Sequence, residues 1–275
     1  MKNKLKHFLR HRFPVLLFWF QSVRFRRQCR RMFFDFQSDI ARTLYDDHAI
    51  CILAGPFQGL RYFNRVVWGP ITPKWLGSYE ACLHGLIEQI KGANYPTIID
   101  IGAAEGYYAV GLAKACPESS VLTFDIDPFA RQLQRELALL NGVENIKVCG
   151  ECNHETLSRI LNLRERALLI CDIEGWEAEL LNPSFCPALS KADILVEIHD
   201  FEGFSALDVC LNLETRFKQT HVIRRLDEEA VDLPGWRAIG SRSLERLDDR
   251  KLRQSLDEHR GTKQTWLWLT AQNPE

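Results

Sequence analysis

The feature that most constrains this chain is a short apolar run that contains an acid and leads directly into a turn bracketed by glycines. The run is Thr97–Ile101 with Asp100 inside it, Gly102 and Gly106 bracket small residues, and an apolar helical pattern begins at Tyr108. This order predicts a strand, a tight turn and a helix. Glycines at such a turn let a ligand approach the main chain, and the free N–H groups at the helix start can bind it.

A second short apolar run, Val121–Asp125, also ends in an acid, 19 residues after Gly106. A carboxylate at the end of such a strand can accept hydrogen bonds from both ribose hydroxyls of an adenosyl group. We favour Asp125 for this role, because Asp127 and Pro128 have the residue types of a helix cap and a first helical position. The acid alone leaves S-adenosylmethionine and a nicotinamide dinucleotide open, since both carry a ribose.

Length and composition indicate one sizeable α/β domain with N-terminal additions, because the 275 residues are 46% apolar. From Thr97 onward, strands and helices alternate, which predicts parallel strands joined by right-handed crossovers. We expect a Rossmann-like, mostly parallel seven-stranded sheet with helices on both faces and an antiparallel C-terminal hairpin. The expected strands are 97–101, 121–125, 145–149, 167–172, 193–198, 220–225 and 264–270, and the expected helices are 106–115, 128–140, 154–162, 177–181 and 205–216.

The chain divides into three parts on this basis. A basic and aromatic segment covers residues 1–36, an extension covers 37–95, and the α/β domain covers 96–275. Within that domain, residues 226–263 are unusually long for a hairpin connection, and their charges predict an inserted helix over 243–259.

Inside the extension, residues 38–75 are rich in turns and show no clear helical period. Trp68 and Trp75 either line a substrate cleft or cover the sheet, and we favour the second interpretation slightly. Ser78 suits an N-cap, so a helix is expected over 78–91.

Polar residues gather where the fourth and fifth expected strands end. Asp172, Glu174 and Glu177 follow one apolar run, and Glu197 and His199 end the next. Ligands of an open parallel sheet bind beyond the carboxyl ends of its strands. Helix capping explains one or two of the acids but not the whole group, so this stretch predicts a functional site.

These runs resemble those of class I methyltransferases that use S-adenosylmethionine, and of the FkbM type in particular, which methylates hydroxyls of sugars or natural products. The resemblance rests on the D-I-G-x-x-x-G-Y run at Asp100–Tyr107, the acidic run at Asp172–Glu177 and the E-I-H run at Glu197–His199. It covers residues 97–200 and leaves out the first 90 residues and the 226–263 insertion.

The resemblance implies S-adenosylmethionine as the cofactor, held by the turn after the first strand and by residues that follow the next strands. The cofactor-binding residues expected on this basis are Asp100, Gly102, Ala104, Glu105, Gly106, Tyr107, Asp125, Ile126, Glu151 and Asp172.

The catalytic residues expected with this cofactor are His199, Asp172 and Glu174. A sulfonium methyl is already electrophilic, so the protein must place a nucleophile in line with it and remove one proton. His199 is the candidate base, Asp172 would hold the cofactor's amino group or the acceptor hydroxyl, and Glu174 would bind the acceptor. Alternatively, His199 is a histidine satisfied by neighbours at a strand end. The carboxylates also allow a divalent cation, which nothing in the sequence requires.

The near-neutral net charge hides an asymmetry. Residues 1–31 carry ten Lys or Arg and no acid, which leaves a net of −11 on the remainder. The apolar run Phe13–Phe20 is eight residues long, whereas spanning a bilayer takes about 20. Two interpretations stand equally: attachment to an anionic membrane surface, or a terminal helix packed on the domain. The net negative charge of the remainder argues against nucleic acid as a partner.

Nine scattered cysteines favour a reducing compartment, so we expect a cytoplasmic protein, peripheral at the inner face of a membrane if the basic segment binds there. Cys149 and Cys152 with His154 could begin a zinc site, but no second pair of ligands follows, and no metal is expected. The expected acceptor is a small molecule or a glycan, and a protein acceptor stays open. The rival interpretations are a nucleotide-dependent oxidoreductase and a non-catalytic cofactor-binding or membrane-associated scaffold.

Overall fold

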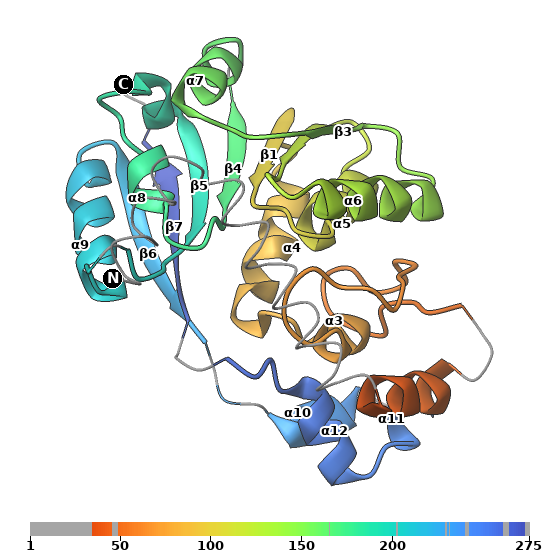
Figure 1. The fold of residues 1–275 in the computed structure, drawn as a ribbon. Helices are drawn as coiled ribbons and strands as arrows, with labels where there is room; N and C mark the ends of the chain where they lie inside the picture. The colour runs from red at the N-terminus through yellow and green to blue at the C-terminus, as the bar shows by residue number, and fades with distance from the viewer. Residues whose placement is uncertain are drawn as a thin grey trace, which may run out of the picture.

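The computed structural model describes a seven-stranded sheet flanked by helices on both faces (Figure 1). The residues described are 35–45, 49–164, 166–201, 203–228, 230, 232–239, 242–260 and 264–272. Nearly all of the basic segment 1–36 therefore lies outside the described residues, and so do the expectations placed on it. None of the helices described combines the length and the apolar content needed to cross a membrane.

The strand order is β3-β2-β1-β4-β5-β7-β6, which confirms the expected fold class. The first five strands are parallel, and β7 pairs antiparallel with both β5 and β6. β1, β4 and β5 are buried along their whole length, as expected for central strands covered on both faces. The strands are β1 Thr97–Ile101, β2 Ser120–Phe124, β3 Ile146–Cys149, β4 Ala167–Cys171, β5 Ala192–Glu197, β6 His221–Asp227 and β7 Thr265–Ala271.

The helices cover the sheet in two groups, each with its own apolar cluster. One cluster joins Ile98 of β1 to Leu112 and Leu137, and the other joins Ile99 to Leu213. Neighbouring strand residues point to opposite faces, so one strand contributes to both clusters. The first group contains α4 His84–Gly92, α5 Tyr107–Ala115 and α6 Pro128–Asn141, and the second contains α7 His154–Asn162, α8 Glu177–Leu180 and α9 Ala206–Phe217.

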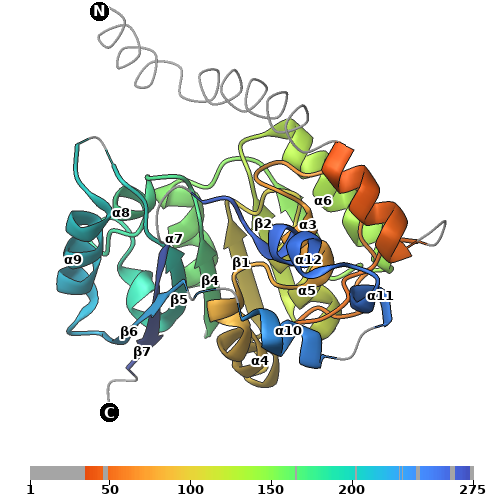
Figure 2. The same ribbon diagram turned by 90° about the horizontal axis from the view of Figure 1, so that it is seen from below.

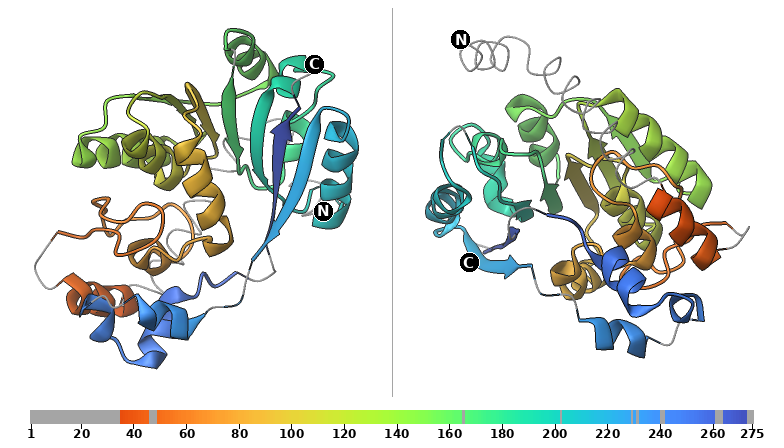
Figure 3. Two further views of the ribbon diagram at one scale, coloured as in Figure 1. Left: turned by 180° about the vertical axis from the view of Figure 1, so that it is seen from behind. Right: turned by 60° about the horizontal axis from the view of Figure 1, so that its bottom comes forward.

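The extension and the insertion pack together beside the sheet, and we call this unit the cap (Figures 2 and 3). Lys251 Nζ lies 2.8 Å from Asp39 Oδ2, and Arg246 donates to the carbonyl of Thr43 at 3.3 Å. Two stretches far apart in sequence thus form one layer. The cap contains the helix over residues 35–45, α3 Thr72–Leu76, α10 Leu233–Ala238, α11 Arg242–Glu245 and α12 Asp249–Leu256.

Three local predictions in these regions were wrong. A helix does not begin at Ser78, because Glu80 has a left-handed backbone (φ +48°), and only the 3-10 turn η1 Ala81–Leu83 and then α4 follow it. The inserted helix is broken into α11 and α12, because Asp248 caps the second through the N–H of Lys251. Residues 38–75 contain helical turns where none was expected.

The burial of Trp75 decides between lining a substrate cleft and packing in the protein interior. Its ring is 1% exposed, and its Nε1 donates to the carbonyl of Phe63 at 3.0 Å. The side chain therefore belongs to the core that joins the extension to the domain.

Candidate functional site

The turn between β1 and α5 is closed tightly against the end of β4. Gly102 has φ +85°, and a Cβ built there would lie 1.6 Å from the carbonyl oxygen of Asp172, so only glycine fits. Gly106, with φ +97°, caps the start of α5. Ala104 between them also has a left-handed backbone (φ +48°), and its N–H donates to Asp125 Oδ2 at 3.0 Å. The turn thus links the ends of β1, β2 and β4.

The two acids after β2 have separate tasks. Asp127 accepts the N–H of Phe129 at 2.9 Å and caps α6, with Pro128 in the first turn, as the sequence predicted. Asp125 instead points to the turn, and its Oδ1 accepts the N–H of Asp127 at 2.7 Å. Burial raises the pKa of Asp125 to about 7, although these backbone N–H groups lower it. Ile126 lies between the two acids and is partly buried.

Asp100, near the end of β1, is a buried carboxylate that can still accept hydrogen bonds. It is 3% exposed, and its Oδ2 has no hydrogen-bond partner among the described residues. Burial, followed by the charge of Asp125, raises its pKa to about 7. An unpaired buried carboxylate oxygen is costly, so this position favours a ligand group that donates a hydrogen bond or carries positive charge.

Glu105 lies in the same turn, but its carboxylate contacts residues of the extension. Its carboxylate is fully buried, pairs with Lys74, and accepts the Tyr62 hydroxyl and the N–H of Val67, each at 3.1 Å. A buried charge must be paired in this way to be tolerated. The contacts of Glu105 thus lie within the protein, between the turn and the extension.

Two further predicted cofactor residues, Tyr107 and Glu151, differ in burial. Tyr107 is 4% exposed, with its ring edge-on to Phe57 and Tyr79 at centroid distances of 5.2 and 5.1 Å. Its hydroxyl has no partner among the described residues. Glu151, after β3, is exposed.

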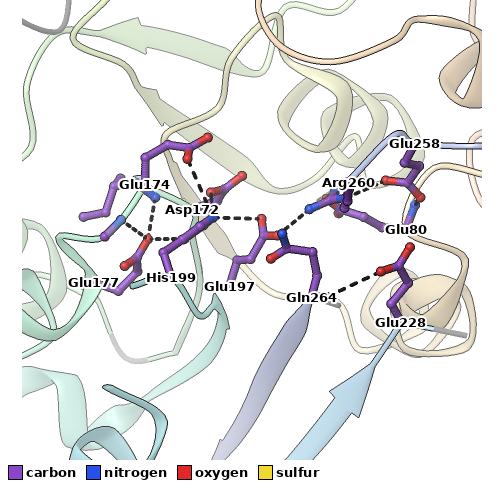
Figure 4. A network of polar contacts seen from close by, with 12 residues as sticks. Glu80, Asp172, Glu174, Glu177, Glu197, His199, Glu228, Glu258, Arg260 and Gln264 are labelled. Carbon is purple, nitrogen blue, oxygen red and sulfur yellow. Dashed lines mark hydrogen bonds and ion pairs between the residues drawn. The ribbon is translucent and has the colours of Figure 1, made fainter. Parts of the chain in front are cut away.

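The predicted catalytic residues meet beyond the ends of β4 and β5 (Figure 4). Nδ1 of His199 lies 2.9 Å from Oε1 of Glu177, which is fully buried. Nε2 lies 3.8 Å from both Asp172 Oδ1 and Glu174 Oε2, and 3.9 Å from Glu197 Oε2. Glu177 therefore fixes the ring, and the other imidazole nitrogen faces three carboxylates.

These carboxylates control the protonation of the histidine. Burial alone would lower the pKa of His199. The hydrogen bond to Glu177 and the charges of Glu197 and Glu174 outweigh burial and raise that pKa to about 9. Burial also raises the pKa of Glu197 to about 7, and burial together with the charge of Glu197 raises that of Asp172 well above its usual range. The carboxylates around the ring therefore favour the protonated, charged form of the His199 imidazole.

The same cluster has a donor set that suits a divalent cation. Asp172, Glu174 and His199 each offer one atom, and these atoms lie within 4.8 Å of one another. Two carboxylate oxygens with one imidazole nitrogen suit a transition-metal cation such as iron or zinc better than magnesium, which prefers oxygen ligands.

A second network, which sequence reasoning missed, lies next to the histidine. Arg260, from the insertion, contacts Glu197 and Glu80 at 2.6 Å each and Glu258 at 2.9 Å. Glu197 is the carboxylate common to both networks (Figure 4). Burial raises the pKa of Glu258 to about 7. No sequence pattern pairs residues 63 and 180 positions apart, so only the fold reveals this group.

The strand order defines a Rossmann-like, mostly parallel sheet with antiparallel strands at the C-terminal end, and the acidic site lies at its carboxyl edge. No protein-family model matches the chain. The chain is 35% identical over 137 residues to a release factor glutamine methyltransferase of Deinococcus radiodurans, a match that covers 47% of the chain and 43% of that protein. The match thus spans less than half of the relative.

Solved structures with a similar arrangement share little sequence. A candidate O-methyltransferase from Klebsiella pneumoniae is 13% identical with a TM-score of 0.43, and 71% of this chain and 82% of that one are covered. Cofactor-bound Rv0187 from MTB is also 13% identical, with a TM-score of 0.42 and coverages of 71% and 80%.

Proposed function

We propose that this protein is an S-adenosylmethionine-dependent methyltransferase of the FkbM type that methylates a hydroxyl of a small molecule or glycan. The observation that carries the proposal is the buried Asp100 with an unpartnered oxygen, next to Asp125 and a glycine turn. A cationic cofactor relieves the repulsion of two buried carboxylates. The pyrophosphate of a nicotinamide dinucleotide would increase it, so the oxidoreductase alternative is disfavoured.

The proposed cofactor site contains most of the residues expected from sequence. Asp125 would accept the ribose hydroxyls, and Asp100 and Asp172 would face the positively charged end of the cofactor. We leave out Glu105, because Lys74 and two hydrogen-bond donors already occupy its carboxylate. The cofactor-binding residues proposed are Asp100, Gly102, Ala104, Gly106, Tyr107, Asp125, Ile126, Glu151 and Asp172.

The bound cofactor supplies an electrophilic methyl group, and the protein's task is to orient the acceptor and take its proton. His199 would receive that proton on Nε2, because Nδ1 is held by Glu177 at 2.9 Å. For this, the imidazole must first lose its own Nε2 proton. A cationic ligand beside Asp172 and Glu174 would lower the pKa of His199 and favour that loss. Glu174, 53% exposed, would contact the acceptor hydroxyl.

The test uses cofactor carrying an isotopically labelled methyl group, incubated separately with glycan, small-molecule and protein fractions and read by mass spectrometry. We expect label in a glycan or small-molecule hydroxyl, and a loss of about 100-fold or more in rate for His199→Ala. Calorimetry with S-adenosylhomocysteine should show nearly unchanged affinity in that variant. Label transfer at the wild-type rate by His199→Ala would remove the histidine from the mechanism.

A protein side-chain amide is the second candidate acceptor. It is favoured by the 35% identity to a release factor glutamine methyltransferase, although the match covers 43% of that relative. Label recovered in the protein fraction, on a glutamine of a defined peptide, would support this acceptor over the hydroxyl.

We also propose that the protein is cytoplasmic and that the basic segment 1–36 attaches it to anionic membrane surfaces, because ten basic residues surround an aromatic run. Full-length protein should float with anionic liposomes, and protein lacking residues 1–34 should not. Equal flotation of the two proteins would contradict the proposal, and liposomes of neutral lipid are the control.

A further inference from the structure

Arg260 is a nearly buried cation where three parts of the chain meet. Glu197 ends β5, Glu80 lies in the extension, and Glu258 belongs to the insertion. All three carboxylates contact the one guanidinium, whose side chain is 17% exposed. An arginine can serve several carboxylates at once because its five N–H donors are fixed in one plane.

Glu80 adopts a strained backbone at this point. Its φ is +48°, its N–H donates to Glu258 at 2.8 Å, and its second oxygen accepts the hydroxyl of Tyr108 in α5. Non-glycine residues adopt this left-handed region at an energetic cost and persist there where the surroundings require them. The network around Arg260 therefore reaches both the cofactor turn and the acid–histidine cluster.

Glu197 divides its two oxygens between the networks. Oε1 lies 2.6 Å from Arg260 Nη1, and Oε2 lies 3.9 Å from His199 Nε2. That second distance is about 1 Å longer than a charge-assisted hydrogen bond. Without the guanidinium, the nearest cation left for the Glu197 carboxylate would be the imidazolium itself.

We propose that Arg260 is a positioning residue: by holding one oxygen of Glu197, it prevents this carboxylate from hydrogen-bonding to Nε2 of His199 and leaves Nε2 open to the acceptor. The proposal rests on the proposed function, because an open Nε2 matters only if His199 takes a proton. The insertion thereby contributes to the chemistry of the site without contacting the reacting atoms.

Crystal structures of Arg260→Gln and Arg260→Lys test the geometry directly. In Arg260→Gln we expect the distance from Glu197 Oε2 to His199 Nε2 to shorten from 3.9 Å to hydrogen-bonding distance, about 2.8 Å. Nitrogen NMR at one fixed pH should show a newly hydrogen-bonded Nε2 in solution. Arg260→Lys keeps the charge and should preserve most of the gap.

Arg237→Gln is the matched control, because Arg237 also anchors the insertion, through the carbonyls of Leu244 and Leu247 at 2.8 and 2.6 Å. It should leave the Glu197–His199 distance unchanged. A gap that stays open in Arg260→Gln, or that closes equally in Arg237→Gln, would overturn the proposal. If Arg260→Gln does not fold, Arg260→Lys decides: a preserved gap with the lysine ammonium held on Glu197 Oε1 supports the proposal. A gap that closes in spite of that contact, or one that stays open with the lysine contacting no carboxylate, overturns it.

The kinetic readout separates this proposal from the proposed function. With an acceptor identified, Arg260→Gln should lower kcat at least about tenfold while changing the KM for the cofactor less than about twofold, and Arg260→Lys should recover part of kcat. A loss confined to the cofactor KM would contradict the positioning role. A gap that closes in a protein showing no methyl transfer with any fraction would support the geometry and count against the methyltransferase assignment.

Discussion

Glu177 and His199 form the pair on which the proposed chemistry depends. The buried Oε1 of Glu177 accepts not only His199 Nδ1 but also the N–H groups of Ile173 and Gly175, at 3.0 and 3.1 Å. These contacts fix the carboxylate before it meets the imidazole. The ring orientation is therefore set by the loop after β4, and Nε2 is presented to Asp172 and Glu174.

Glu174→Gln tests the electrostatic control of this histidine. The substitution removes a negative charge 3.8 Å from Nε2, so the pKa of His199 should fall from its value of about 9. The alkaline rise of kcat with pH should move to lower pH by up to about one unit. The measurement is kcat against pH at saturating cofactor and acceptor.

Asp200→Asn is the control for that profile. Asp200 neighbours the histidine in sequence, but its carboxylate accepts the N–H of Ala206 at 2.7 Å, and it is not among the groups that shift the pKa of His199 most. Its profile should match the wild type. If the rise of kcat with pH does not move in Glu174→Gln, a group other than His199 titrates in the kcat profile.

At the residue level, sequence predicted what adjacent strands bring together. β4 pairs in register with β5, so Asp172 and His199, just past their ends, had to lie close. The Asp-Pro pair identified Asp127 as the N-cap residue of α6. Asp125 was therefore the acid predicted to bind a ligand. The carboxylate that holds the ring, Glu177, was noticed only as one acid among three, because its role depends on side-chain orientation.

At the scale of elements, the Lys74–Glu105 pair ties α3 of the cap to the turn after β1. Lys74→Met should destabilise the protein by about 3–5 kcal/mol, because it leaves Glu105 charged, buried and without its cation. Lys74→Met combined with Glu105→Gln should recover part of this loss, since glutamine can still accept from Tyr62 and Val67. Urea unfolding of the three proteins gives the free energies.

Lys91→Met serves as the comparison, because Lys91 pairs with the exposed Glu88 at 2.9 Å and should cost about 1 kcal/mol or less. If Lys74→Met and Lys91→Met lower the free energy of unfolding equally, burial of the Lys74–Glu105 pair does not increase its contribution to stability.

The elements of the domain were predictable because each contains its own periodicity, and the cap was not. In the helix over residues 35–45, Phe36, Ile40 and Leu44 recur every four residues, a signal that the sequence contained and the turn-rich stretch after it obscured. The pairing of this helix with the insertion depends on contacts about 200 residues apart, such as Lys251 with Asp39. Such contacts leave no local pattern.

At the scale of the whole molecule, the acidic site should make stability depend on pH. The pKa values of Asp100, Asp125, Glu197 and Glu258 are raised to about 7, and that of His199 to about 9. The folded state thus binds more protons than the unfolded state between about pH 4 and pH 9, so the free energy of unfolding should fall as pH rises through this window.

The ligand-free protein should therefore melt at a higher temperature at pH 6 than at pH 8.5, and calorimetry at constant ionic strength measures the difference. Asp100→Asn should flatten the dependence by removing one of the titrating groups. A melting temperature that rises from pH 6 to pH 8.5 would mean that these carboxylates are not strained by burial.

The central claim, a cationic adenosyl cofactor held by Asp100 and Asp125, is tested most directly by titration calorimetry. S-adenosylmethionine, S-adenosylhomocysteine and NADH would be titrated into wild type, Asp125→Asn, and Asp127→Asn, whose asparagine can still cap α6. We predict tight binding of both adenosyl ligands, no binding of NADH, and a loss of at least about tenfold in affinity for Asp125→Asn only. Binding of NADH in place of the adenosyl ligands, or equal affinities in all three proteins, would contradict the account.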